Sequence, residues 1–283
     1  MKKLFILLLA SAFVFASCSN GNSKPDEPVP EPRIEVTGKL GKYGSPYEVS
    51  DIVFNDGSAT PYTAQLTLTD EQKAAAIAVI FYKGKGLNNG NDKTTSRTLG
   101  VGLKHGGSIA WCTSSANAYG KKITTILCTA SGNTGAYTFN GDKNGSDNLE
   151  QIEAFEGVDD TATAANYPAF YFAKQYNEQK IGSETVSRIA GTSYETGWYL
   201  PSLAELYQIY TNGIRTNQVF DIDAASILCG GDQFGTKWYW SSSQYDSSSN
   251  ANEINTVNFS SGGIPKYYKS NNEGHVCTIR EFN

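Results

Sequence analysis

The sequence has little histidine and no excess of positive charge, and both shortages argue against whole classes of function. Lysine and arginine number 23 against 28 aspartate and glutamate residues, so the formal net charge is −5. Without a basic stripe the chain has no surface suited to a phosphate backbone, and we expect no nucleic-acid partner. A Ser-His-Asp triad could be built only on His105 or His275, and serine is too abundant for such a set to indicate catalysis.

Cysteine is scarce as well, and its five residues include no C-x-x-C spacing of the kind that predicts a zinc site or a reactive pair. Four cysteines remain when Cys18, which belongs to the N-terminal segment, is set aside. An even number in an exported protein predicts two disulfides. Three pairings are possible, and proximity in the sequence favours Cys112–Cys128 and Cys229–Cys277.

The N-terminus is typical of an exported chain. Two lysines precede an uncharged apolar stretch, residues 4–15, which is too short to span a bilayer as a mature helix. Ala16-Ser17-Cys18 follows and resembles a bacterial lipobox. The resemblance implies that residues 1–17 are a signal peptide and that Cys18 carries the lipid anchor. The alternative is an ordinary secretory signal followed by an incidental cysteine.

Residues 18–33 are predicted to form a tether. Four prolines, several charges and few apolar residues leave this segment unable to bury enough surface to fold, and proline stiffens it. The remaining residues, 34–283, are enough for one sizeable domain, which we expect to be monomeric. Attachment through Cys18 would hold this domain in the cell envelope, as a surface-exposed lipoprotein of the outer membrane.

The first half of the domain is predicted to be strands around one short helix. An apolar strand in residues 51–59 runs into Asn-Asp-Gly, a tight-turn signature. Thr69 and Gln72 have the spacing of a capping box at the start of a helix. Residues 78–82 then form a buried strand, and residues 98–104 are its expected partner.

The second half is predicted to contain two helices and a small antiparallel sheet. Residues 131–146 are expected to be loops, residues 148–155 one or two helical turns, and residues 165–179 a helix. A second helix begins at Pro201 or Ser202 and ends at Gly213. Strands follow at residues 237–241, 253–259 and 275–281. Helices, small sheets and long connections without a tandem repeat predict an α+β fold.

Residues 238–275 have the composition of a binding surface. Serine, asparagine, tyrosine and glycine, which antibodies use in their binding loops, make up more than half of this stretch. The alternative is a solvated, hairpin-rich surface with no particular role, because asparagine also favours turns. From polar or aromatic residues in or beside the predicted loops we predict these ligand contacts: Lys237, Tyr239, Gln244, Asp246, Ser247, Ser249, Asn250, Asn255, Pro265, Tyr267, Tyr268 and Lys269. Trp198, Trp238 and Trp240 are expected to pack as scaffold.

Three segments carry a family resemblance. GWYLPSLAELYQIY (residues 197–210), YWSSSQY (239–245) and HVCTIREF (275–282) resemble, in order and spacing, the helix start, the W-S-S strand and the closing strand of formylglycine-generating-enzyme-like domains. This resemblance implies the C-type-lectin-like fold of that subclass. It also implies that Glu205 is structural and hydrogen-bonds loop backbone, and that Arg280 is a buried or half-buried partner for a carboxylate.

The whole chain is more similar still to the treponemal variable lipoproteins. The similar segments are DIVFNDGSA, GVGLK, YPAFYFAK, LCGGDQFG and the terminal IREFN. In that family a diversity-generating retroelement rewrites codons at the 3′ end of the gene, and exposed residues change while the fold is kept. The resemblance implies that this chain binds an external protein or glycan through a variable surface at about residues 237–275.

Two other functions are less well supported. A formylglycine-generating enzyme needs a redox-active cysteine pair that holds copper, and Cys229 and Cys277 are the only late cysteines. A calcium-dependent sugar lectin would carry Glu-Pro-Asn or Gln-Pro-Asp, and both are absent; Asp221 and Asp223 suit a helix cap better than a metal loop, and Asp159 and Asp160 a solvated surface. We therefore expect no enzyme activity, cofactor or metal. A structural envelope lipoprotein without a dedicated ligand is the main alternative.

Overall fold

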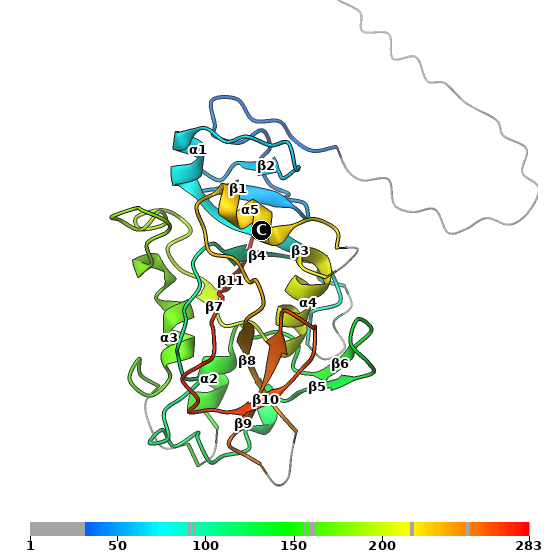
Figure 1. Ribbon diagram of the computed structural model, residues 1–283, viewed down its shortest axis with the longest axis vertical. Coiled ribbons are helices and arrows are strands. Elements are labelled where there is room, and N and C mark those ends of the chain that lie inside the picture. The colour runs from blue at the N-terminus through cyan, green and yellow to red at the C-terminus, as the bar shows by residue number, and fades with distance from the viewer. Residues whose placement is uncertain are drawn as a thin grey trace, which may run out of the picture. The chain divides into compact units, whose positions relative to one another are not determined.

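The computed structural model describes residues 32–89, 92, 94–155, 157–158, 162–215, 218–246 and 250–282 (Figure 1). The chain divides into Met1–Pro32 and Arg33–Asn283, and the helices and strands named here all belong to the second unit. The predicted signal peptide, Cys18, most of the tether, Asp159, Asp160, Ser247 and Ser249 lie outside the described residues. Within the described ranges, no helix combines the length and the apolar character needed to cross a bilayer.

A six-stranded antiparallel sheet forms the upper part of the unit in Figure 1 and has the strand order β2-β1-β3-β4-β11-β7. Its strands are β1 (Asp51–Phe54), β2 (Ala59–Pro61), β3 (Ala76–Gly84), β4 (Arg97–Gly102), β7 (Trp198–Tyr199) and β11 (Ile279–Glu281). The predicted hairpin at Asn-Asp-Gly is confirmed, since β1 pairs with β2 around that turn. The predicted pairing of the next two strands is also confirmed, as β3 pairs with β4.

The last predicted strand, residues 275–281, is wrong in its extent and its partners. Only β11 is a continuous strand, and it lies between β4 and β7 in the large sheet. His275 and Val276 form isolated bridges with Tyr239 and Gly106. The end of the chain thus passes from the small sheet to the large one. The alternation of side chains along residues 275–281, from which one strand was predicted, does not reveal this change of sheet.

The helices are short, and their caps explain where they begin. They are α1 (Asp70–Ala75), α2 (Asn148–Glu153), α3 (Pro168–Lys174), α4 (Leu203–Gly213) and α5 (Ile222–Leu228), with 3₁₀ turns η1 (Thr124–Ile126) and η2 (Tyr176–Glu178). Both members of the predicted capping box of α1 are present, and Ser202 and Glu205 form a second box on α4, which ends at Gly213 as predicted. Asp221 caps α5, as predicted.

The helix predicted at residues 165–179 is shorter than expected. It begins at Pro168, whose ring suits the first helical position, and ends at Lys174 because Gln175 leaves the helical conformation (φ −97°, ψ 30°). A 3₁₀ turn then carries Tyr176 into the core, where it is almost fully buried. Burial of that ring outweighs the local tendency to continue the helix.

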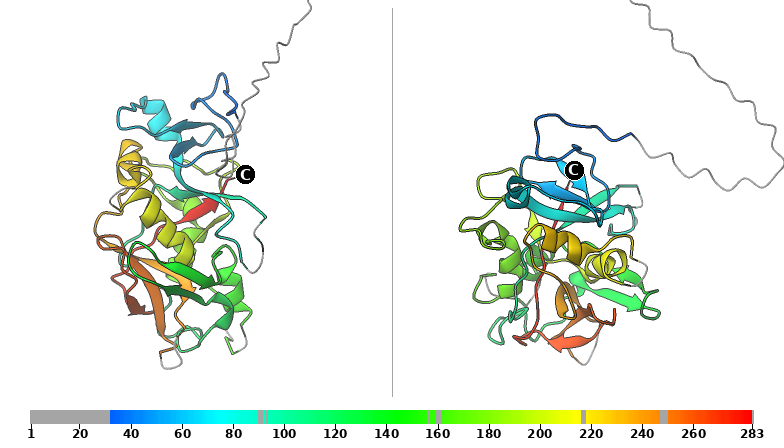
Figure 2. Two further views of the ribbon diagram at one scale, coloured as in Figure 1. Left: turned by 90° about the vertical axis from the view of Figure 1, so that its right-hand side faces the viewer. Right: turned by 45° about the horizontal axis from the view of Figure 1, so that its top comes forward.

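Two small antiparallel sheets form the lower part of the unit (Figures 1 and 2). One contains β8 (Trp238–Gln244), β9 (Glu253–Asn258) and β10 (Lys266–Tyr268), in the order β10-β9-β8. The other is a hairpin of β5 (Cys128–Ser131) and β6 (Thr138–Gly141). This hairpin corrects the expectation of loops in residues 131–146, which are too polar to show a strand pattern. The α+β class is confirmed.

The two predicted disulfides are not present. Cys112, Cys128, Cys229 and Cys277 are buried and form no disulfide in the described part of the chain. Cys112 packs with Trp111 and Trp240, whereas Cys128 belongs to the separate cluster around α4, so proximity in sequence does not bring the first pair together. The four thiols act as small apolar core residues.

Thiol titration checks this correction. We expect the folded chain to leave Cys112, Cys128, Cys229 and Cys277 unreactive toward a thiol reagent, because burial raises the pKa of Cys128 and of Cys229 to about 12 and the thiolate is the reactive form. All four should react in denaturant without reductant. A gain in reactive thiols on adding reductant to the unfolded chain would instead reveal a disulfide.

Candidate functional site

The predicted ligand contacts lie on and around the sheet β8–β10, but the fold divides them between its interior and its surface. Tyr239, Gln244, Asn255 and Lys269 are buried. Lys237, Asp246, Asn250 and Tyr268 are exposed, and Pro265 and Tyr267 are half-buried. The segment between β4 and η1 and the hairpin β5–β6 pack against this sheet and cover the first group.

Tyr239 is a core residue and not the surface anchor that was predicted. Its hydroxyl hydrogen-bonds His105 Nδ1 at 2.9 Å, and its ring lies 4.8 Å from the ring of Phe234. Burial raises the pKa of Tyr239 and lowers the pKa of His105 to about 3, so both groups are neutral at physiological pH. This pair ties β8 to the segment after β4 and is closed to an external ligand.

Gln244 and Asn255 hold neighbouring loops in place. Gln244 accepts a hydrogen bond from the Ile123 amide at 2.9 Å and donates to the carbonyls of Lys121 and Ala251 at 3.0 and 2.7 Å. Asn255 donates to the carbonyl of Cys128 at 3.2 Å, which joins β9 to β5. The prediction that their side chains face a ligand is therefore wrong for Gln244. Asn255 is 3% exposed and is one of the residues that line a pocket.

Lys269 is fully buried, which corrects its assignment as a surface contact. Its ammonium donates to the carbonyls of Ala118 and Lys121 at 2.7 and 3.0 Å and lies 5.1 Å from the centre of the Trp111 ring. Burial lowers the pKa of Lys269 to about 8. The residue holds the loop before η1 against β10.

The three consecutive serines of β8 also face inward. Ser241 donates to the Asn255 carbonyl, Ser242 accepts from Asn148 Nδ2, and Ser243 accepts from the Leu203 amide at the start of α4. All three are fully buried. Some of the serines whose abundance indicated a binding surface therefore form hydrogen bonds inside the fold.

Three of the exposed residues lie close to β10 in the chain or in its sheet: Asp246 and Asn250 belong to the turn between β8 and β9, and Tyr268 ends β10. Lys237 precedes β8, at the other end of that strand. Tyr268 is 56% exposed and is one of the few large apolar side chains on the described surface. Tyr267 stacks on Trp238 with ring centres 4.1 Å apart, and Asp246 pairs with Lys122 at 2.5 Å. Trp240 and Trp198 are buried, as predicted for scaffold residues, and Trp238 is partly buried.

A pocket of about 260 Å³ opens between this sheet and the hairpin β5–β6. We call it the Lys266 pocket, and it is lined by Thr129, Ala130, Tyr137, Tyr245, Asn255, Ile264 and Lys266. The Lys266 ammonium lies 3.5 Å from the centre of the Tyr245 ring. Tyr245 and Lys266 lie inside the polar stretch but were not among the predicted contacts, and Tyr137 belongs to a hairpin that was not predicted.

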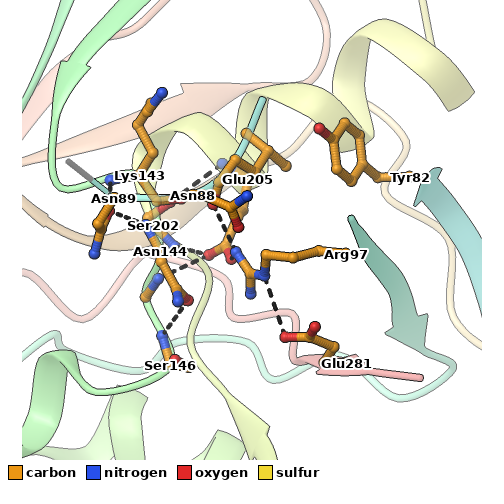
Figure 3. Close-up of polar contacts among 12 residues, drawn as sticks. Tyr82, Asn88, Asn89, Arg97, Lys143, Asn144, Ser146, Ser202, Glu205 and Glu281 are labelled. Carbon is orange, nitrogen blue, oxygen red and sulfur yellow. Dashed lines mark hydrogen bonds and ion pairs between the residues drawn. The ribbon is translucent and has the colours of Figure 1, made fainter. Parts of the chain in front are cut away.

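A buried ion-pair network joins the large sheet to α4 (Figure 3). Glu205 Oε1 accepts from Arg97 Nη1 at 2.9 Å and from the Tyr199 hydroxyl at 3.0 Å. Its Oε2 accepts from the amides of Gly145 and Ser202 at 3.0 and 2.8 Å. The hydrogen bonds to loop backbone that the resemblance implied for Glu205 are thus present, and all its acceptor capacity serves the fold.

Arg97 and Arg280 differ in what they bind. Figure 3 shows the Arg97 guanidinium between the carboxylates of Glu205 and Glu281, the latter 3.1 Å from Nε. Arg280 instead donates to the carbonyls of Thr196 and Ser193, and no carboxylate pairs with it among the described residues. The predicted carboxylate partner of Arg280 is therefore wrong, because carbonyl groups of the turn before β7 accept hydrogen bonds from its guanidinium.

Metal-ligating side chains do not converge in this structure. Among the residues that it describes, no group of three or more His, Cys, Asp or Glu side chains could hold a metal ion.

Comparison with known proteins identifies a solved structure with a similar fold. No protein-family model matches the chain, and no curated protein matches it. A fimbrial protein from Bacteroides ovatus ATCC 8483 has a similar solved structure, with a TM-score of 0.54 over 83% of this chain and 16% sequence identity. This chain covers 49% of the fimbrial chain, about half its length. At this identity the likeness shows a shared fold alone.

Proposed function

We propose that the chain is a lipid-anchored protein of the cell surface that binds an external protein or glycan through the exposed side chains around β10. The observation that carries this proposal is the placement of those side chains. Within the unit Arg33–Asn283, the described chain begins beside β1 and β2, whereas β9 and β10 lie at the opposite end (Figures 1 and 2). A tether that enters at one end would present the other end to the surroundings.

The C-type-lectin-like assignment remains part of this proposal, and contacts among the three motif segments support it. The Ser243 hydroxyl of the W-S-S strand accepts from Leu203 at the start of α4, and the Ser242 amide donates to the Pro201 carbonyl at 2.7 Å. β7, which precedes α4, pairs with β11 of the closing strand. Segments far apart in the sequence therefore meet, as a single scaffold built from the three motifs would require.

We further propose that the chain is a member of the treponemal variable lipoproteins, with variation confined to the exposed side chains. Burial of some described residues between 237 and 269 and exposure of others supports this, because exposed positions tolerate change without loss of the core. A surface location is also in keeping with a shared fold in a fimbrial protein.

Thiol burial supports a binding role over the enzyme alternative. Cys229 and Cys277 are both buried, and burial raises the pKa of each thiol. A copper-holding pair needs thiolates that the metal and substrate can reach. We propose that both are packing residues.

Tyr268 is the residue whose loss should weaken binding most. An exposed tyrosine gives large contact area at low entropy cost, and such residues dominate binding energy. On a panel of immobilised extracellular-matrix proteins, mucins and glycans, we expect the full chain to bind at least one component. Tyr268→Ala should weaken that binding by about tenfold without changing the melting temperature.

Val186→Ala is the matched control, because Val186 is an exposed apolar residue on the loop between η2 and β7. It should leave binding unchanged. Equal binding by wild type and Tyr268→Ala, or no component bound by the wild type, would overturn the proposed function.

A further inference from the structure

We propose that the Lys266 pocket recognises the carboxylate of an acidic sugar, such as a uronic acid. This inference rests on the proposed function, because it names the class of ligand that part of the same surface takes. The pocket lies beside β10 and includes Asn255, one of the predicted contacts.

The charge of the pocket selects an anion. Although the chain carries a net charge of −5, Lys266 supplies an ammonium and none of the described lining residues is acidic. Lys266 forms no salt bridge within the described ranges, whereas nearby Lys122 is paired with Asp246. An unpaired ammonium in a partly enclosed site attracts a carboxylate, and that bond would be charge-assisted.

The ammonium is also held in position. Its place 3.5 Å over the Tyr245 ring is a cation–π contact that restricts a side chain otherwise free to move. Tyr245 lies at the end of β8, and β10 pairs with β9 through Lys266 and Asn255. A ligand would therefore meet a cation that is already oriented, which lowers the entropy cost of binding.

The remaining lining fits a sugar ring better than an acidic peptide side chain. At about 260 Å³ the pocket is slightly smaller than the range of roughly 300–1,000 Å³ that holds drug-sized ligands. The Tyr137 ring can pack against the C–H groups of a pyranose, and the Thr129 hydroxyl can hydrogen-bond a hydroxyl of the sugar. A glutamate side chain would reach Lys266 but leave these groups unused.

Binding of methyl β-glucuronide to the full chain tests the proposal. Measured by calorimetry and ligand-observed NMR, we expect a dissociation constant on the order of 1 mM, typical of a small polar ligand. Methyl β-glucoside and the methyl ester of the glucuronide, which lack the charge, should bind about tenfold more weakly. The affinity for the glucuronide should also fall as salt is added, because the pocket is open to solvent.

Single substitutions distinguish binding in the Lys266 pocket from non-specific binding to other lysines on the surface. Lys266→Met should weaken glucuronide binding about tenfold, while Lys266→Arg keeps the cation and most of the affinity. Lys180→Met is the matched control, since Lys180 is an exposed lysine outside the pocket, and it should bind as the wild type does.

Three results would overturn the proposal: no glucuronide binding, equal binding of glucuronide and glucoside, or tighter binding of hexaglutamate than of glucuronide. None of them decides the proposed function, which is tested on whole macromolecules with Tyr268→Ala. Loss of panel binding in that variant together with no glucuronide binding would leave the surface role standing and remove the acidic sugar.

Discussion

Glu205→Ala is expected to lower the free energy of unfolding by about 3–5 kcal/mol, the cost of removing one partner from a buried ion pair. Arg97 and Glu205 side chains are 3% and 0% exposed, so the guanidinium would keep its charge in a dry site with only Glu281 opposite it. The amides of Gly145 and Ser202 would also lose their acceptor, and α4 would lose its capping box. Chemical denaturation of wild type and variant measures the difference.

Glu281→Ala is the control for this prediction. Glu281 bonds the same guanidinium, but its side chain is 33% exposed, so solvent screens the pair and its removal should cost about 1 kcal/mol or less. If Glu205→Ala were no more destabilised than Glu281→Ala, the network would not hold α4 to the sheet, and the structural role of Glu205 would be wrong.

Lys269→Ala is expected to cost about 2–4 kcal/mol of stability without acting on a ligand directly. Truncation would leave a cavity against Trp111 and remove the donor from the carbonyls of Ala118 and Lys121. Lys269→Met also loses the charge and both hydrogen bonds but fills most of the same space, so it should be destabilised less. Denaturation of both variants at pH 7 measures this order, and a Lys269→Ala protein as stable as wild type would contradict the buried position.

Stability of the wild type relative to Lys269→Met should rise between pH 8 and pH 10.5. Burial lowers the pKa of Lys269 to about 8, whereas the unfolded chain keeps the ordinary value of 10.5. Below pH 8 both states are protonated, and the cost of burying the ammonium is present in full. Above pH 8 the folded state releases its proton while the unfolded state still holds it, so stability rises with pH.

The comparison with Lys269→Met isolates this effect. Burial raises the pKa of Cys128, Cys229 and Tyr176, so these groups lower the stability of both proteins in the same alkaline range. A difference between the two proteins that stays constant or falls from pH 8 to pH 10.5 would mean that Lys269 is solvated.

Features fixed by neighbours in the chain could be predicted from the sequence. The capping box predicted at Thr69 depends on a partner three residues away and is present, and α4 has Ser202, one of the two predicted start positions, as its N-cap. The Asn-Asp-Gly turn and the buried strand β3 likewise follow from adjacent residues. The length of α3 could not be predicted in this way, because burial of Tyr176 ends the helix.

The division of the candidate site could not be predicted, because it depends on segments more than a hundred residues away. The buried Lys269 ammonium donates hydrogen bonds to the carbonyls of residues 118 and 121, and the buried Asn255 amide donates to the carbonyl of Cys128. In the sequence, a polar residue that hydrogen-bonds a distant backbone group cannot be told apart from one whose side chain is exposed and free to contact a ligand. The serines of β8 show this most plainly, since they hold α4 and α2 instead of facing solvent.

The central claim is that binding belongs to the exposed side chains around β10, while the buried polar residues of the same stretch hold the fold. The most direct test displays the full chain on bacterial cells with single substitutions at the described contact residues, and sorts each variant for protease resistance and for binding the panel component that the wild type binds. We predict that substitutions at Lys237, Asp246, Asn250 and Tyr268 reduce binding alone. Substitutions at Tyr239, Gln244, Asn255 and Lys269 should reduce protease resistance. Binding lost at the buried residues with resistance intact, together with no effect at Tyr268, would contradict the account.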